Sequence, residues 1–362
     1  TYRVDQFNSL NDLFDLKVVF LFDNMWNYKM DQDKLISACN FEQHYLLKGI
    51  KLKGRVFRFG VFKKIKEINP DIIISYEYSL TTQYIILLKK LGLIKQNIGI
   101  TTDDSIDFCH NVQSLARQII RNNSLSKLSF IVVLSNEVSK FYKNKFQLKD
   151  NQVIISPILQ SSDKLREKSD TREEKANFNI DRYKLNNKKV LLFVGRLIPE
   201  KALESFLQTI SILLSDYDNI VFVIVGEGKE KSKLQDVINK NKLNNKVIFT
   251  GKLEGSDVHS WYLSASGFVL PSISEAFGAV VNESLIFGTP VLCSKYAGAS
   301  SLINKKNGLI FDPFDIEDTI SKTKGFLNNI HPIKEISIEN KPSLMEDLDE
   351  QFINEWEKLQ YV

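Results

Sequence analysis

The chain has 362 residues, of which 43% are hydrophobic and 25% charged, and its formal net charge is +4. This length predicts about two domains of ordinary size, and the composition excludes a disordered or fibrous protein. The longest unbroken apolar run, Ile220–Val225, has six residues, far fewer than the roughly 18 that a membrane-spanning helix requires. The three cysteines are widely spaced, so we expect a reducing, cytoplasmic compartment rather than a disulfide framework.

Short apolar segments alternate with amphipathic helical patterns along nearly the whole chain. The expected strands are 16–22, 71–75, 98–101, 130–134 and 153–155 in the first half, and 190–194, 220–225, 247–249, 267–270 and 290–293 in the second. Strands rich in Val and Ile that alternate with helices are typical of parallel sheets covered on both faces. We therefore predict an α/β protein with two doubly wound, Rossmann-like domains at 1–160 and 186–342, a polar linker at 161–185 and a C-terminal helix at 343–362.

The charge is distributed unevenly along the chain. Residues 1–155 have a net charge of +7 and the remainder −3, and eight of the basic residues lie in the stretch 48–66, which has no acidic residue. Aromatic and aliphatic residues alternate with these charges, and an anionic membrane surface attracts such a segment by about 1 kcal/mol per nearby Lys or Arg. Two interpretations follow: peripheral contact with the inner face of the cell membrane, or a solvated helix face whose apolar side packs in the core. No recognition motif accompanies the charge, so nucleic acid is not an expected partner.

A first group of candidate site residues follows the buried strand at 190–194. The strand ends at Gly195, Arg196 comes directly after it, and Pro199 suits the first turn of the next helix, which carries Lys201. Arg binds phosphate oxygens through a planar fork and Lys acts as a point charge, so the two cations together are able to clamp a diphosphate. The alternative is an ordinary loop with two surface cations.

A second group follows the strand at 267–270. The loop after this strand holds Glu275, Phe277 and Gly278, and a helix that begins near residue 279 carries Glu283 in an early turn. With the first carboxylate in the loop, both can face one ligand at the carboxyl end of the strand, and carboxylates accept hydrogen bonds from vicinal hydroxyls. Acidic residues near a helix N-terminus are also common simply because they favour the helix dipole.

Taken together, these motifs resemble those of the retaining glycosyltransferases of family 4, which have the GT-B fold. Gly195-Arg196-x4-Lys201 is similar to the phosphate-binding Arg and Lys of that family, and Glu275-x7-Glu283 to its Glu-x7-Glu signature. Val225-Gly226-Glu227-Gly228 and Phe249-Thr250-Gly251-Lys252 resemble the turns that line the same donor pocket. The matches occur in the family's order across residues 190–313, and this conjunction is specific.

The resemblance implies a role for each matched residue. Arg196 and Lys201 would neutralise the donor pyrophosphate, Glu275 would hold hydroxyls of the transferred sugar at the catalytic centre, and Glu283 would hold the nucleotide ribose. The turns at Gly195 and Gly226 would line the donor pocket, the amides around Phe277 and Gly278 would cradle phosphate, and Lys252 would flank the base. The two domains would face one another across a cleft, and the C-terminal helix would cross back onto the first domain.

The amino-terminal half departs from the family pattern. The family usually has a Gly-rich loop after its first strand, whereas residues 21–26 contain no Gly, and it commonly has a His-Asp pair after a later strand, where this chain has Asp103 and Asp104. We expect Asp103 or Asp104 to orient or deprotonate the acceptor. His110, a few residues further on, and Glu77, at the end of the strand 71–75, are candidates for acceptor contact.

Neither the aspartate pair nor the four histidines show the spacing of a metal site. Since Arg196 and Lys201 can neutralise a leaving phosphate, we expect no metal and no cofactor beyond the nucleotide-sugar co-substrate. The resemblance implies a transferase that moves a sugar from a nucleotide-diphosphate sugar to a hydroxyl of a glycan or lipid-linked glycan, with retention, in the synthesis of a bacterial surface polysaccharide.

Several alternatives remain open from the sequence. One is a non-catalytic GT-B scaffold or binding subunit, and another is an inverting transferase that uses Asp103 or Asp104 as its base. A sugar epimerase or phosphorylase on the same architecture is a third, because fold alone does not fix the reaction. A dinucleotide-dependent oxidoreductase is disfavoured, because neither half has Gly-x-Gly-x-x-Gly at the start of a helix.

Overall fold

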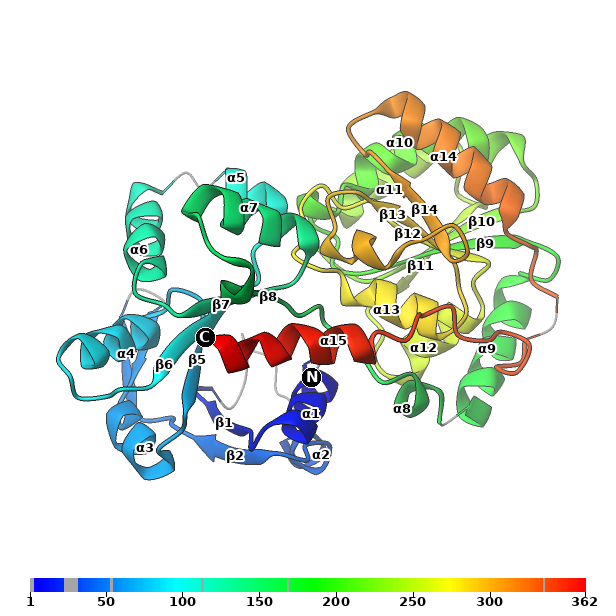
Figure 1. Ribbon diagram of the computed structural model, residues 1–362. Helices are drawn as coiled ribbons and strands as arrows, with labels where there is room; N and C mark the ends of the chain where they lie inside the picture. The colour runs from blue at the N-terminus through cyan, green and yellow to red at the C-terminus, as the bar shows by residue number, and fades with distance from the viewer. Residues whose placement is uncertain (1–2, 23–31, 53–54, 112–113, 168, 335) are drawn as a thin grey trace. The chain divides into compact units, whose positions relative to one another are not determined.

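The computed structural model describes residues 3–22, 32–52, 55–111, 114–167, 169–334 and 336–362, and it divides into two compact units (Figure 1). Unit 1 comprises residues 1–104, 108–159 and 348–362, and unit 2 comprises residues 105–107 and 160–347. The loop at 23–26, where the sequence departs from the family pattern, lies outside the described residues. Each unit is built on a parallel sheet.

Unit 1 has a central sheet of four parallel strands that pair in chain order. They are β5 (Ile72–Tyr76), β6 (Asn97–Thr101), β7 (Phe130–Val133) and β8 (Val153–Ile155). A separate parallel pair is formed by β1 (Lys17–Phe20) and β2 (Glu42–Tyr45). All four residues of β7 are buried, as expected for a strand of a sheet covered on both faces.

The basic stretch 48–66 does not form a single helix face. It consists of an antiparallel pair, β3 (Gly49–Leu52) and β4 (Arg55–Arg58), followed by the start of α3 (Val61–Ile68). Val61 and Ile65 of α3 are buried, which agrees with the interpretation of a solvated helix whose apolar side packs in the core. Ile50 and Phe59, by contrast, are exposed large apolar side chains.

Helices surround these strands in unit 1. They are α1 (Val4–Leu13), α2 (Gln32–Ser37), α4 (Leu80–Lys90), α5 (Ile106–His110), α6 (Leu115–Leu125), α7 (Asn136–Phe146) and the short 3-10 helix η1 (Asp150–Gln152). Three of them begin with a serine cap: Ser79, Ser114 and Ser135 accept hydrogen bonds from the backbone amides of Thr82, Arg117 and Val138.

The end of the chain belongs to unit 1. The helix expected from residue 343 begins later, at Asp349, as α15 (Asp349–Glu357), and continues as the 3-10 helix η4 (Lys358–Tyr361). Phe352 and Trp356 of α15 are buried in one apolar cluster with Phe130 and Ile154 of the central sheet. Trp356 Nε1 also donates a hydrogen bond of 3.0 Å to Ser156 Oγ, so the tail covers one face of the sheet at β7 and β8.

Unit 2 has a sheet of six parallel strands in the order β11-β10-β9-β12-β13-β14. The strands are β9 (Lys189–Val194), β10 (Ile220–Val225), β11 (Val247–Gly251), β12 (Gly267–Leu270), β13 (Val291–Ser294) and β14 (Gly308–Phe311). The chain moves outward from β9 to β11 and then returns to the other side of β9 with β12. The winding therefore reverses between β9 and β12, which is the arrangement of a doubly wound fold.

The helices of unit 2 lie on both faces of this sheet. They are α8 (Ser162–Arg166), α9 (Ser169–Tyr183), α10 (Leu203–Asp216), α11 (Lys231–Lys240), α12 (Ser256–Leu263), α13 (Ala279–Ile286), α14 (Ile316–Asn329) and the 3-10 helices η2 (Pro199–Lys201) and η3 (Gly298–Leu302). Figure 1 shows α10 and α14 on one side of the sheet and α12 and α13 on the other. The segment 161–185, expected as a linker, forms α8 and α9 and is part of unit 2.

Candidate functional site

The predicted donor residues of unit 2 gather where the winding of the sheet reverses. β9 and β12 are adjacent and parallel, with Leu191 opposite Gly267, so both strands end at the same edge of the sheet. Gly195 and Arg196 follow β9, and the loop with Glu275 follows β12. In open α/β sheets, ligands bind outside the carboxyl ends of the strands at this reversal.

The turns after β9, β10 and β11 pack backbone against backbone. Gly226 has φ +148°, and a Cβ atom at this position would lie 1.9 Å from the carbonyl oxygen of Gly195. The amide of Gly226 donates to the carbonyl oxygen of Gly251 at 2.8 Å, and the amide of Gly195 donates to that of Val225 at 3.0 Å. Only glycine at position 226 permits this approach, which fixes the turn that carries Arg196.

The two predicted phosphate-binding cations have different surroundings. Arg196 is exposed, and its guanidinium forms no hydrogen bond with the residues that the structure describes, while its carbonyl oxygen accepts from the Ile198 amide at 3.1 Å. Lys201, in η2, forms an ion pair with Glu275 through Nζ and Oε2. The amide of Ile273 donates to the carbonyl oxygen of Glu200 at 3.0 Å, so a backbone bond and an ion pair both join the turn after β9 to the loop after β12.

The loop after β12 is also held by its own backbone. Its residue Gly278, at φ +96°, precedes α13, and no side chain caps this helix. The amides of Gly298 and Ala299 donate to the carbonyl oxygens of Glu275 and Phe277 at 3.2 and 2.7 Å. The Phe277 ring is buried. The uncapped amides at the start of α13 therefore lie in the same loop as Glu275.

Glu283 is set apart from the Lys201–Glu275 pair. Its side chain is buried at 6% exposure, Oε2 accepts a hydrogen bond of 2.8 Å from the Tyr262 hydroxyl, and Gln160 Nε2 lies 3.5 Å from Oε1. Burial raises the pKa of Glu283, although both hydrogen bonds oppose this effect. No hydrogen bond joins it to Glu275 in the described part of the chain.

Two further features lie near these turns. Lys252, after β11, is exposed and pairs with Glu254 at 2.6 Å.

A pocket of about 280 Å³ lies beside η2, and its lining includes Pro199, Ile273 and Phe314. None of the predicted donor residues lines this pocket, so it adds nothing to the assignment of the donor residues.

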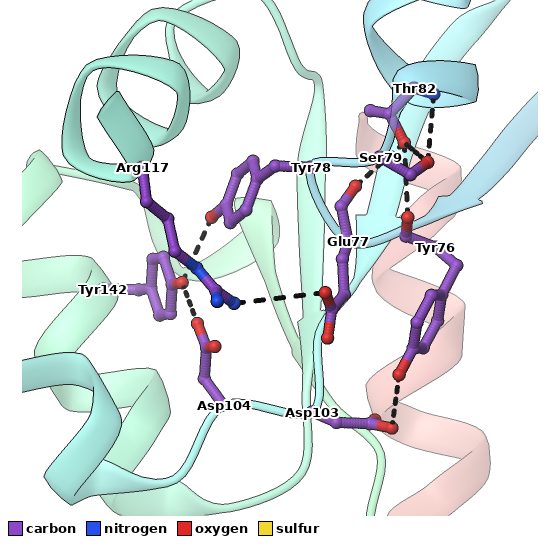
Figure 2. A network of polar contacts seen from close by, with 9 residues as sticks. All are labelled: Tyr76, Glu77, Tyr78, Ser79, Thr82, Asp103, Asp104, Arg117 and Tyr142. Carbon is purple, nitrogen blue, oxygen red and sulfur yellow. Dashed lines mark hydrogen bonds and ion pairs between the residues drawn. The ribbon is translucent and has the colours of Figure 1, made fainter. Parts of the chain in front are cut away.

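In unit 1, Asp103 and Asp104 follow β6 but belong to different networks (Figure 2). Asp103 pairs with Arg3 through Oδ1 and accepts a hydrogen bond of 2.9 Å from the Tyr76 hydroxyl through Oδ2. The Tyr76 ring follows directly from the end of β5. Side chains as well as backbone therefore join the neighbouring strand ends, since the Glu77 amide also donates to the carbonyl oxygen of Thr101 at 2.8 Å.

Asp104 is directed into unit 1 and is 4% exposed. Its Oδ2 accepts a hydrogen bond of 2.5 Å from the Tyr142 hydroxyl, which lies 3.1 Å from the Tyr78 hydroxyl. Burial raises the pKa of Asp104, and the hydrogen bond from Tyr142 together with nearby Arg117 and Arg121 lowers it in part.

Glu77 and His110, the candidates for acceptor contact, lie apart. Glu77 follows β5 at φ +48°, and its carboxylate lies 4.0 Å from Arg117 Nη2. His110 is exposed at the end of α5, not at a helix start, and packs edge-on against Phe141 with ring centroids 5.0 Å apart. No hydrogen bond joins His110 to either aspartate in the described residues.

Several residues in these networks were not predicted from the sequence. Tyr262 and Gln160 hold Glu283, Tyr142 holds Asp104, and Arg3 holds Asp103. Each is far from its partner along the chain and belongs to no recognisable motif. Only Tyr76 and Tyr78 could have been identified from the sequence, because they flank Glu77, a predicted site residue.

The described residues contain neither a metal-binding cluster nor a membrane-spanning helix. No group of three or more His, Cys, Asp or Glu is arranged to hold a metal ion. In the same part of the chain, no helix has both the length and the apolar character needed to cross a bilayer.

Comparisons with known proteins agree with this arrangement. Residues 175–341 match the family model of the glycosyl transferases group 1. An uncharacterised glycosyltransferase from Haemophilus influenzae is 25% identical over 350 residues, which are 95% of this chain and 90% of that protein. An uncharacterised glycosyltransferase from Methanocaldococcus jannaschii is 34% identical over 138 residues, but the match spans only 38% of this chain and 35% of that relative.

Solved structures share the fold at low sequence identity. HepE from Anabaena, solved in complex with UDP, has a TM-score of 0.69 at 13% identity and covers 96% of this chain and 92% of its own. The lipopolysaccharide outer core galactosyltransferase WaaB has a TM-score of 0.66 at 16% identity, covering 99% and 94%. The predicted fold class is confirmed: the chain has the GT-B fold with two Rossmann-like units. The sequence matches identify the protein as a glycosyltransferase.

Proposed function

We propose that the protein transfers a sugar from a nucleotide-diphosphate sugar bound by unit 2 to a hydroxyl of a glycan or lipid-linked glycan bound by unit 1. The observation that carries the proposal is the ion pair between Lys201, after β9, and Glu275, after β12. It joins the residue proposed to bind phosphate to the residue proposed to bind sugar hydroxyls, at the reversal of the sheet. The UDP complex of the structural neighbour HepE supports a nucleotide donor.

The donor side would act mainly on the leaving group. Transfer breaks the bond between the anomeric carbon and the pyrophosphate, so negative charge grows on the leaving phosphate. Arg196, Lys201 and the uncapped amides at the start of α13 would stabilise this charge most strongly in the transition state. Arg196 is exposed, so its guanidinium is accessible to a ligand. Lys201 would contact a phosphate oxygen and keep a weaker contact with Glu275.

The remaining donor contacts would select the sugar and the nucleotide. Glu275 would accept hydrogen bonds from sugar hydroxyls, and Glu283 would accept them from the ribose while Tyr262 fixes its other oxygen. Gly195 and Gly226 would allow the donor to approach the backbone, and Lys252 would flank the base. On the acceptor side, one of the four candidates Asp103, Asp104, Glu77 and His110 would contact the acceptor hydroxyl. No metal is proposed, because Arg196 and Lys201 would carry the leaving-group charge.

Calorimetric titration with UDP, GDP and ADP, and then with the matching nucleotide sugars, tests the donor assignment. We expect Arg196→Ala, Lys201→Ala and Glu283→Ala each to weaken binding, by about tenfold or more where a charged contact is lost. Lys231→Ala is the matched control, because this exposed lysine of α11 pairs only with exposed Glu227. Unchanged binding in all three site variants would exclude the donor site proposed here.

We further propose membership of glycosyltransferase family 4, retention at the anomeric carbon and a role in bacterial surface polysaccharide synthesis. The motifs Gly195-Arg196-x4-Lys201 and Glu275-x7-Glu283 support the family, and the similarity to the galactosyltransferase WaaB supports the role. The anomeric coupling constant of the product in proton NMR distinguishes retention from inversion. Inversion would instead favour a carboxylate base at the end of β6.

The surface formed by β3, β4 and α3, here called the basic surface, is proposed to contact an anionic membrane at the cytoplasmic face. It exposes Ile50 and Phe59 beside Lys51, Arg55 and Lys63, so apolar and basic side chains occur together. Flotation with vesicles of phosphatidylglycerol and phosphatidylcholine should recover the protein at low salt and lose it at high salt. Flotation equal to that with phosphatidylcholine alone would refute this proposal.

A further inference from the structure

Three carboxylates lie at the carboxyl ends of β5 and β6, and two of them are already engaged. Asp103 uses one oxygen for Arg3 and the other for the Tyr76 hydroxyl. Asp104 is nearly buried and bonds to Tyr142. A proton taken from an incoming hydroxyl by either aspartate would weaken these existing contacts, because the carboxyl would lose its negative charge.

Glu77 is far more exposed than Asp104 and about as exposed as Asp103, whose side chain is 33% exposed, but its carboxylate contacts are longer than theirs. The Glu77 side chain is 35% exposed, and Arg117 Nη2 lies 4.0 Å from Oε2, which is longer than a hydrogen bond. Figure 2 shows the Glu77 carboxylate extending toward the Arg117 guanidinium, on the side of the Asp104–Tyr142 pair. An incoming ligand can therefore reach Glu77 without displacing a hydrogen bond as short as those of the aspartates.

The backbone holds Glu77 in place at some cost. A residue other than glycine at φ +48° costs about 1 kcal/mol or more. The conformation is retained because the Glu77 amide donates to the carbonyl oxygen of Thr101 at 2.8 Å, and its carbonyl oxygen accepts from Thr82 Oγ1 at 2.8 Å. Thr82 is itself bonded to Ser79, the cap of α4. The backbone from which the side chain extends is thus held by three residues, Thr101, Thr82 and Ser79.

A buried cation beside this network also has donors without an acceptor, although its guanidinium packs against the Phe141 and Phe146 rings. Arg121, four residues after Arg117 on α6, is 3% exposed, and its Nε and Nη1 have no hydrogen-bond acceptor in the described part of the chain. Its charge acts on Asp104 and Tyr78, since it lowers the pKa of both. Unpaired buried donors of this kind fit a region that receives an oxygen-rich ligand.

We propose that Glu77 is the carboxylate that contacts the reacting hydroxyl of the acceptor, and that Asp103 and Asp104 only stabilise the strand ends. This inference rests on the proposed transferase function. In the step, the acceptor oxygen forms a bond to the anomeric carbon, and the bond from that carbon to the diphosphate oxygen breaks. Its electron pair leaves with the nucleoside diphosphate, and the acceptor proton passes to Glu77.

Two properties of the site suit this role. Burial raises the pKa of the Glu77 carboxyl, Asp103 and Asp104 add to the effect, and Arg117 opposes it, so the ionised form is a stronger base than an ordinary glutamate. The neighbouring guanidinium of Arg117 only donates hydrogen bonds, whereas the carboxylate only accepts them. The pair fits two adjacent hydroxyls of a sugar ring, one donating to Glu77 and the other accepting from Arg117.

The test compares Glu77→Gln, Asp103→Asn and Asp104→Asn with Glu67→Gln, a control on exposed α3. Each protein is titrated with UDP, GDP and ADP. Release of the nucleoside diphosphate from the matching nucleotide sugars is then measured with water and with p-nitrophenyl hexopyranosides as acceptor probes. We expect Glu77→Gln to keep nucleotide binding and to lose about 100-fold or more in turnover, while both Asn variants stay within about tenfold of the wild type. The acidic limb of the wild-type pH profile should be absent from the residual activity of Glu77→Gln.

The two proposals fail in different ways. Turnover of Glu77→Gln within about threefold of the wild type would overturn the role of Glu77, and so would a wild type that binds a nucleotide but turns over no donor with any probe. A larger loss in Asp103→Asn or Asp104→Asn than in Glu77→Gln would move the base to that aspartate. If the wild type binds none of the nucleotides, the proposed transferase function fails instead.

Discussion

The two candidate site regions are built by different means. In unit 2, backbone contacts between successive turns hold the site, with Gly226 against Gly195 and Ile273 bonded to Glu200. In unit 1, side chains hold it, through the chain Asp104–Tyr142–Tyr78 and the contacts of Asp103. A backbone-built site keeps its shape when surface side chains change, whereas a side-chain network changes with each member. We therefore expect the donor region to tolerate side-chain substitution better than the acceptor region, and glycine substitution far worse.

The same contrast applies to buried charge. Lys341 in unit 2 donates through Nζ to the carbonyl oxygens of Tyr262, Leu263 and Ala265 and to Thr289 Oγ1, at 2.6 to 3.1 Å. Its partners are mostly the backbone at the end of α12. Asp104 in unit 1 is satisfied by a single side chain, Tyr142.

The largest effect is expected for Gly226→Ala. A Cβ atom 1.9 Å from the carbonyl oxygen of Gly195 forces the two turns apart, and φ +148° adds strain, so the free energy of unfolding should fall by about 3 kcal/mol. Nucleotide binding should weaken with it, because Arg196 moves. Thermal melting and calorimetry measure the two losses.

Gly255→Ala is the matched control for Gly226→Ala. Gly255 also has positive φ, at +56°, but no atom lies within 4 Å of its Cβ position, so it suffers only the strain of about 1 kcal/mol. Equal melting temperatures for the two variants would mean that backbone contact between the turns does not hold the donor region.

The second effect is expected for Lys341→Met. It leaves the carbonyl oxygens of Leu263 and Ala265 without their lysine donor, while that of Tyr262 keeps Thr289 Oγ1, and the free energy of unfolding should fall by about 2 to 3 kcal/mol. Thermal melting gives the loss, with exposed Lys305→Met as the control. If the free energy of unfolding falls no more than in the control, water satisfies the freed carbonyl oxygens without loss of stability.

Lys341 also predicts a pH dependence. Burial lowers its pKa to about 7, from 10.5 in the unfolded chain, so the folded protein binds this proton less tightly. The wild-type free energy of unfolding should therefore rise with pH between these two values, relative to Lys341→Met. A difference between the two melting temperatures that does not change across this range would contradict the prediction.

The fold and the donor region were largely predictable, and the reason is local. Gly195-Arg196-x4-Lys201 and Glu275-x7-Glu283 are short spacings, and a buried strand before each places it at the sheet edge. The Lys201–Glu275 ion pair was not predictable from either motif alone, because it depends on β9 and β12 being neighbours.

For the acceptor candidates, the sequence predicted only that they follow the ends of strands, and not which residues they contact. Asp103 and Asp104 are adjacent in sequence but point into different networks, and nothing near them indicates Tyr142 or Arg3 as partners. The start of the last helix was placed six residues too early, because Leu344 and Leu348 continue the helical spacing of α15 without being part of it. Tertiary contacts decided each of these points.

The third effect tests the side-chain network directly. Tyr142→Phe removes the hydroxyl that donates to Asp104 and leaves this buried carboxylate without its partner, so the free energy of unfolding should fall by about 1 to 3 kcal/mol. The pKa of Asp104 should rise further, because the hydrogen bond that lowers it is lost. The loss should therefore be greater at neutral than at acidic pH, where the protonated carboxyl is less costly to bury. Tyr45→Phe should have little effect, because Tyr45 is exposed and its hydroxyl donates, among the described residues, to half-buried Gln43.

The smallest effect concerns the backbone at Glu77. Glycine adopts φ +48° without strain, so Glu77→Gly should be about 1 kcal/mol more stable than Glu77→Ala. At Glu67, inside α3, the order should reverse by a similar amount, because glycine weakens a helix relative to alanine. Thermal melting of the four variants gives both differences. If Glu77→Gly is the less stable of its pair, the turn after β5 is not strained. The position of the Glu77 carboxylate would then depend on its side-chain contacts alone, as it does for the aspartates beside it.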